Sequence, residues 1–164
     1  MNMKLLNLSQ DDLYSISNQV LDLAKNNGAS AAEVEISVST GKTISTRMGH
    51  LETVELNNGK SLSVTVFYGH RQGIASTSDF SKIALESCVD AACQIAKYTA
   101  EDKAFGLANS SLYCSDIKDL NIYNSYFDSQ DLMIEKVIEC EEEALKFDRR
   151  ITNSEGAQLS TSEN

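Results

Sequence analysis

The chain has 164 residues, a hydrophobic content of 41% and a formal net charge of −10. A chain of this length suits one domain, and it can bury roughly 70% of the surface that its unfolded form exposes. Acidic residues outnumber Lys and Arg by 24 to 14, which argues against a nucleic-acid partner because phosphate binding needs a basic face.

The N-terminal residues contain no long apolar run, so neither a signal peptide nor a membrane span is expected. The four cysteines, Cys88, Cys93, Cys114 and Cys140, form no C-x-x-C pair. Without an export signal, we expect reduced thiols and a cytoplasmic protein.

The first predicted element is a helix that begins after Ser9 and ends at Asn26-Asn27-Gly28. Ser9 is a good N-cap, and Gly28 tolerates the left-handed conformation that ends many helices. The apolar positions recur at helical spacing and predict a buried stripe of Leu13, Ile16, Val20, Leu23 and Ala24.

Residues 32–79 predict antiparallel strands, because apolar and polar residues alternate with period two. Val34, Ile36 and Val38 show this alternation first. An interruption is expected at Thr40-Gly41-Lys42. A hairpin turn is expected at Asn57-Asn58-Gly59-Lys60, because Asn-Gly accepts the positive φ values of a primed turn.

The last strand of this group is expected at Ile74–Thr77, after a turn across Gly69–Gly73. A second helix, capped by Ser78 or Asp79, is predicted at about Phe80–Tyr98. Its expected buried stripe consists of Ile83, Ala84, Ser87, Cys88, Ala91, Ala92 and Ile95.

Thr99–Asp119 lacks periodicity and is expected to be a long connection lying over the domain. Asp128-Ser129 then caps a third predicted helix, about Gln130–Phe147. Its expected buried stripe is Leu132, Ile134, Val137, Ile138, Ala144 and Leu145, and its expected wet side is Glu139 and Glu141–Glu143.

A further strand is possible from Ile151 onward. Together the elements predict an α+β fold, an antiparallel β-meander covered on one face by helices.

The search for catalytic groups predicts no catalytic and no metal-binding residue. A zinc hydrolase needs converging ligands, commonly two His on one helical face. This chain has only His50 and His70, and neither has a helical partner. Cys88 and Cys93 are five residues apart on a helix and do not converge. There is also no G-x-S-x-G elbow.

Several short motifs occur in an order that carries a family resemblance. They are Arg47-Met48-Gly49, Val54-Glu55 and Arg71-Gln72-Gly73-Ile74-Ala75-Ser76-Thr77, followed by Ala96–Thr99, Gly106–Ala108 and Ile151–Gly156. In this order and spacing they resemble the N-terminal domain of the TldD/PmbA metallopeptidase family, with a closer likeness to the PmbA (TldE) branch. The resemblance covers most of the chain and implies one such domain over residues 1–164, without the C-terminal catalytic-type domain.

This resemblance implies a cytoplasmic subunit that pairs in the proteolysis of unfolded peptides. In the family, the TldD partner carries the zinc in an HExxxH helix, with a distant Cys. This sequence has no HExxxH, so we expect no cofactor in this chain and no activity of the chain alone. The implied partners are a TldD-like subunit or a second copy, and unfolded peptides, but neither nucleic acid nor membrane.

Arg47, Glu52, Glu55 and Arg71 are the candidate site residues, as the lining of a peptide groove or an interface. The alternative is that they are wet-face strand residues making weak surface ion pairs.

Two function classes remain open. The first is a peptidase-complex domain that shapes the peptide-access cavity and the pairing of subunits. The second is a non-enzymatic peptide- or protein-binding module that acts by dimerisation or strand addition.

Overall fold

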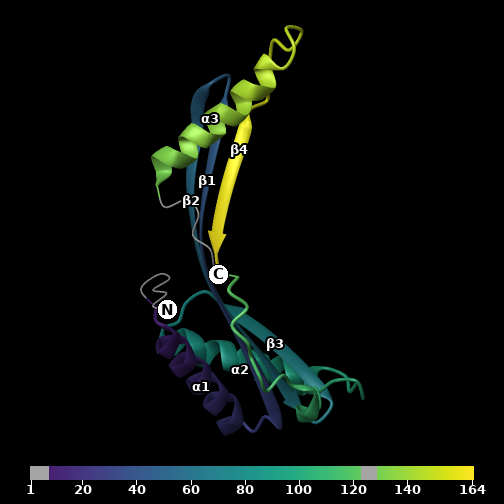
Figure 1. The fold of residues 1–164 in the computed structure, drawn as a ribbon. Coiled ribbons are helices and arrows are strands. Elements are labelled where there is room, and N and C mark those ends of the chain that lie inside the picture. Colours follow the sequence, from purple (N-terminus) through teal and green to yellow (C-terminus); the bar gives the residue numbers. More distant parts are fainter. Residues whose placement is uncertain (1–7, 123–128) are drawn as a thin grey trace. The chain divides into compact units, whose positions relative to one another are not determined.

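A computed structural model describes residues 8–122 and 129–164 (Figure 1). The strands form one sheet in the order β3-β2-β1-β4, and three helices pack against it. This confirms the predicted α+β class and the antiparallel sheet. The elements in chain order are α1 (Gln10–Asn26), β1 (Ala31–Arg47), β2 (His50–Tyr68), β3 (Arg71–Thr77), α2 (Lys82–Tyr98), the 3-10 turn η1 (Ser110–Leu112), α3 (Gln130–Lys146) and β4 (Ala157–Glu163).

The chain divides into two compact units. Unit 1 comprises residues 1–38 and 59–116, and unit 2 comprises residues 39–58 and 117–164. The long strands β1 and β2 each contribute one segment to each unit. The assignment of the whole chain to one domain stays a prediction.

Unit 1 has a core in which α1 and α2 pack on the sheet. The expected stripe of α1 is confirmed, since Val20 and Ala24 are fully buried and Leu13, Ile16 and Leu23 are partly buried. They meet Leu62, Val64 and Val66 of β2, whose alternation was predicted. Apolar side chains at every second strand position therefore hold the helices on the sheet.

The predicted stripe of α2 is wrong in part. Ile83 and Ile95 are exposed, while the buried residues are Leu85, Cys88, Val89, Ala92, Cys93 and Ala96. Both sides of this helix carry apolar residues, so periodicity could not choose between them. Gly73 of β3 shows which side faces the sheet, because a Cβ on Gly73 would clash with the carbonyl oxygen of Ala92.

The N-cap of α2 is Ser81 rather than Ser78 or Asp79. Asp79 still organises this end of the helix, because its carboxylate accepts from the Ser81 N–H at 2.8 Å and from the Ser81 hydroxyl at 3.0 Å. The Ser81 backbone N–H is the main reason that the pKa of Asp79 lies below its ordinary value.

The predicted hairpin turn at Asn58-Gly59 is wrong. Asn57–Lys60 lie inside β2, and the turn between β1 and β2 is at Met48-Gly49. Met48 has φ 51° and Gly49 has φ 75°, the left-handed pair that a two-residue primed turn requires. The expected interruption at Thr40–Lys42 is also wrong, because β4 pairs with β1 through this stretch, Gly41 opposite Ser162.

In unit 2, α3 packs on the segment of the sheet formed by β1 and β4. Met133 and Val137 of α3 and Ile44 of β1 are its buried apolar core, flanked by Ile134, Ala157 and Leu159. The predicted C-terminal strand is confirmed as β4, which begins at Ala157 and pairs antiparallel with residues 40–46. Ser129 caps α3, accepting from the Leu132 N–H at 3.1 Å; Asp128 lies outside the described residues.

The predicted stripe of α3 is only partly right. Val137 is buried and Ile134, Ile138 and Leu145 are half-buried, but Leu132 and Ala144 are exposed. The buried line is Met133, Val137 and Glu141, spaced by four residues. Glu141, predicted on the wet side, is therefore inside.

Residues 99–119 form a connection whose described regular structure is η1 alone, as the sequence predicts. Its first part is tied to the turn between β2 and β3, because the Asp102 N–H donates to the His70 carbonyl at 3.0 Å. In the described part of the chain, no helix is long and apolar enough to cross a membrane.

The turn position yields a paired test. Gly49→Val should lower the free energy of unfolding by about 1–2 kcal/mol, because a β-branched residue is strained at positive φ. Gly59→Val should change it by no more than about 0.5 kcal/mol, since extended backbone accepts Val. Chemical denaturation measures both, and equal losses in the two variants would contradict this position of the turn.

Candidate functional site

The turn between β1 and β2 is held by a carboxylate from α3. Glu141 accepts from the Met48 N–H at 2.7 Å and from the Gly49 N–H at 2.9 Å, one bond to each carboxylate oxygen. The two N–H groups converge because successive left-handed residues form a small anion-binding concavity. The Arg-x-Gly motif is thus a structural turn with its anion supplied by the same chain.

Glu141 is 2% exposed, so its charge relies on these hydrogen bonds. The Gly49 N–H is the main cause that holds the pKa of Glu141 below its ordinary value of 4.5. Burial opposes this shift, and the Ser154 hydroxyl and the Met48 N–H add to it. The carboxylate therefore stays ionised and links α3, the β1–β2 turn and the segment before β4.

Sequence reasoning missed Glu141 because it read the acidic run 139–143 as one solvated face. A signal was present, since Glu141 follows Met133 and Val137 at intervals of four and so lies on their side of the helix. The run alone could not show that two turn N–H groups would face it.

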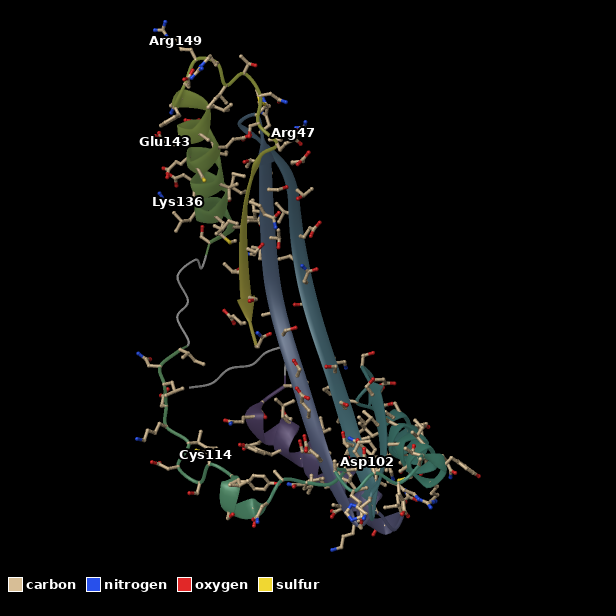
Figure 2. All side chains as sticks on the ribbon, turned by 90° about the vertical axis from the view of Figure 1, so that its right-hand side faces the viewer. Arg47, Asp102, Cys114, Lys136, Glu143 and Arg149 are labelled. Carbon is tan, nitrogen blue, oxygen red and sulfur yellow. The ribbon has the colours of Figure 1, made fainter. Side chains whose placement is uncertain are left out.

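Arg47, a predicted site residue, lies at the end of β1 beside this turn (Figure 2). Its guanidinium is 3.8 Å from the Glu155 carboxylate, and both side chains are substantially exposed. An exposed ion pair of this length contributes little to stability, so Arg47 is available to another anion.

Glu52 and Glu55 are exposed residues of β2 in the same unit. They are three residues apart on a strand, so they lie on opposite faces of the sheet. The hydroxyls of Ser45 and Thr53 are 2.7 Å apart, which places Thr53, and by alternation Glu55, on the face of Ser45. The structure therefore does not bring Glu52 and Glu55 into one cluster.

These two residues do share an open strand edge. β3 pairs only with residues 62–68 of β2, so among the described strands residues 50–58 have β1 as their single neighbour. Every residue from 50 to 58 is exposed, including Leu51, Val54 and Leu56. An exposed edge with apolar side chains is a ready site for pairing with another strand.

Arg71, the fourth candidate, belongs to unit 1, whereas the other three candidates belong to unit 2. Its Nε lies 3.4 Å from the Glu101 carboxylate, and its Nη1 donates to the Lys97 carbonyl at 3.3 Å. These contacts tie the start of β3 to the end of α2 and to the connection beyond it. The geometry indicates a structural role for Arg71.

Tyr68 completes this end of unit 1. Its hydroxyl donates to the Asn27 carbonyl at 2.7 Å, and the Lys97 ammonium lies 5.6 Å from its ring centre. Burial, aided by Cys93, raises the pKa of Tyr68 to about 12. The phenol therefore remains a proton donor at neutral pH and serves to hold the end of α1.

The described residues contain no group of three or more His, Cys, Asp or Glu side chains that could hold a metal ion. Cys88 and Cys93 are buried, and Cys114 and Cys140 are exposed; all four are free thiols. Burial raises the pKa of Cys88, which makes it a poor nucleophile.

Glu141→Gln should lower the melting temperature at pH 7 by several degrees, since an amide cannot accept from both turn N–H groups without turning its own donors toward one of them. It should also weaken the acid dependence of stability. The folded pKa of Glu141 is lowered, so its contribution is complete above the ordinary value of 4.5 and is lost as pH falls through the folded pKa.

Thermal melts between pH 7 and pH 3 test this. Glu143→Gln, on the exposed side of the same helix, is the matched control and should leave both the melting temperature and its acid dependence nearly unchanged. If the melting temperatures of Glu141→Gln and of the unmodified chain fell equally as the pH is lowered, the role given to Glu141 would be wrong.

Comparison with known proteins places these features in a family. Residues 32–96 match the family model described as PmbA/TldA metallopeptidase domain 1. The metalloprotease PmbA homolog of Haemophilus influenzae is 37% identical over 157 residues, which cover 96% of this chain and 35% of that protein. Metalloprotease PmbA of Escherichia coli O157:H7 is 40% identical over 130 residues, which cover 79% of this chain and 29% of that protein.

A crystal structure from Bacteroides thetaiotaomicron, described as that of a candidate modulator of DNA gyrase, shares the fold. Its TM-score is 0.79 at 23% identity, over 94% of this chain and 39% of that one. The chain spans about a third of the length of the curated relatives it matches. By sequence, the chain belongs to the PmbA/TldD metallopeptidase family and corresponds to its domain 1 region.

Proposed function

We propose that this chain is the first domain of a PmbA-like subunit in the cytoplasm, where it shapes the cavity through which unfolded peptides reach a paired, zinc-bearing TldD-like subunit. Membership of the family supports the setting. The observation that carries the role is the open edge of β2 at residues 50–58, because an extended peptide can pair with it through main-chain groups.

Main-chain pairing is indifferent to sequence, which suits a protein that receives diverse unfolded chains. A peptide added at this edge places alternate side chains on the two faces of the sheet. Glu52 lies on one face and Glu55 on the other, and among the described residues no ion pair neutralises either carboxylate. The edge thus favours basic peptides over acidic ones, with a contribution that salt screens.

Leu51, Val54 and Leu56 add apolar surface along the same segment, at exposed fractions of 46%, 36% and 67%. Because these apolar side chains lie beside the main-chain donors and acceptors, an added strand can bury apolar surface as well as form hydrogen bonds. Peptides with basic and apolar residues are the expected ligands, and the binding is weak because one short strand provides little area.

The alternative is a binding module that acts without any peptidase partner. The same open edge supports it, because strand addition needs no catalytic group. Affinity purification of the tagged chain from native cytoplasm separates the two, since the first role requires recovery of a TldD-like subunit and the second does not.

The peptide proposal predicts chemical shift changes at residues 50–58 when a basic unstructured peptide is titrated into the labelled chain. Glu52→Lys/Glu55→Lys should weaken binding and its salt dependence, and Glu142→Lys/Glu143→Lys on α3 is the control with the same change of charge. A second probe is a peptide N-methylated at every second residue, made in two versions that block opposite sets of N–H groups. The version that blocks the N–H groups facing the strand edge should bind less well than the other. Shifts confined to α3, or none at millimolar peptide, would rule out the edge.

The chain alone is predicted to hydrolyse nothing, because the family's zinc motif has no counterpart in it. Purified chain is incubated with unfolded peptides and zinc, and the products are examined by mass spectrometry. Chelator-sensitive cleavage that follows the chain through every purification step would overturn this prediction.

A further inference from the structure

The two faces of the β2 edge at residues 50–58 have different surroundings. The Thr40 hydroxyl donates to the side-chain oxygen of Asn58 at 2.8 Å, so these two residues lie on one face of the sheet. Ile44 shares that face, because it stands four residues after Thr40 on the same strand. Ile44 packs against α3, so this is the face that α3 covers. By alternation along β2, the same face carries Glu52, Val54 and Leu56.

On this face α3 covers β1 and β4 but leaves β2 exposed. The strand residues in its apolar core are Ile44 of β1 and, at the border, Ala157 and Leu159 of β4. Val54 and Leu56 of β2 lie on the same face and remain exposed. A strand added at the β2 edge would therefore direct alternate side chains over exposed apolar residues and toward the flank of α3.

The flank of α3 on the β2 side carries a shallow groove. Ile134 and Ile138 lie about 60° and 100° round the helix from the buried Val137. Glu141 lies about 40° round in the same direction and bonds to the turn between β1 and β2. This direction is the β2 side of the helix, since β2 and β4 flank α3 on its left and right in Figure 1. The residues that line the groove are Asp131, Ile134, Glu135, Ile138 and Glu139.

The groove combines apolar and acidic side chains. Ile134 and Ile138 are half-buried, whereas Asp131 and Glu135 are exposed. Among the described residues, neither of these two carboxylates forms an ion pair. A long basic side chain suits such a surface, because its aliphatic stem can cover apolar groups while its charged end meets a carboxylate in water.

The other charges near the groove leave it negative. Glu139 is 2.6 Å from the Lys136 ammonium, so its charge is largely balanced. Glu52 adds a carboxylate without an ion pair in the described part of unit 2, on the α3 face of the sheet. Lys42 of β1 is a cation on that face, two residues from Ile44. Three unpaired carboxylates, those of Glu52, Asp131 and Glu135, therefore outnumber it.

We propose that the groove and the α3 face of the β2 edge select peptides that carry Lys or Arg at every second residue. The basic side chains of the added strand lie on the α3 face, with their stems against Val54 and Leu56 and their charged ends toward Asp131 and Glu135. The residues between them point to the other face, which α3 does not cover. This inference rests on the proposed function and adds the pattern of the ligand to it.

Two peptides of identical composition test the pattern. One carries Lys and Thr in strict alternation, and the other carries them as adjacent pairs, which divides the Lys side chains between the two faces. Both are titrated into the labelled full chain, and the shifts of residues 50–58 and of the Ile134 and Ile138 methyl groups are followed. The alternating peptide should bind about three- to tenfold more tightly, the effect of a few exposed ion pairs.

Charge reversal on α3 should remove this preference. In Asp131→Lys/Glu135→Lys the two peptides should bind alike, and Asp131→Asn/Glu135→Gln should reduce the preference without adding positive charge. Asp11→Lys/Asp22→Lys on α1 is the matched control, since it reverses one first-turn acid and one later exposed acid. It should keep the preference, and thermal melts establish that every variant is folded.

The outcomes separate this inference from the proposed function. Shifts at residues 50–58 with equal affinity for the two peptides would overturn the inference and leave the peptide edge standing. A preference that survives in Asp131→Lys/Glu135→Lys would also overturn it, because the selectivity would then come from another surface. No shifts at residues 50–58 with either peptide at millimolar concentration would overturn the proposed function and this inference together.

Discussion

The left-handed conformation of two successive residues, Met48 and Gly49, is the constraint on which the strand arrangement depends. A two-residue turn fixes which residues of β1 and β2 lie opposite each other, and a shift of one position would move every side chain to the other face. Both strands are long, and each serves both compact units. Within unit 2, the turn therefore helps to align the apolar positions of β1 under α3.

Glu141 is what makes this turn specific. A buried carboxylate is costly unless it is fully hydrogen-bonded, and here the two turn N–H groups supply bonds that an ordinary surface turn would give to water. The two hydrogen bonds join α3 to the turn at Met48-Gly49, so the docked helix and the formed hairpin stabilise each other. A polar contact of this kind contributes specificity beyond what Met133 and Val137 provide by burial.

The edge of β2 at residues 50–58 is a surface that this packing leaves open. It offers main-chain groups with the carboxylates of Glu52 and Glu55 beside them, and under the proposed function its ligand is an extended basic peptide. That role needs no catalytic group in this chain, which spans about a third of the length of the curated relatives it matches.

The sequence by itself determined the α+β class, the stripe of α1, the alternation of β2 and the final strand, because each rests on local periodicity or a cap. Its family motifs also identified the family. Tertiary structure alone decided the rest. Asn58-Gly59 is a favourable turn sequence, yet strand pairing keeps it extended inside β2. Helix α2 has two apolar sides, and close contact with Gly73 determines which one faces the sheet. Glu141 belongs to an acidic run that is typical of a solvated face, but it is buried because two N–H groups, 92 and 93 residues away in sequence, donate to its carboxylate.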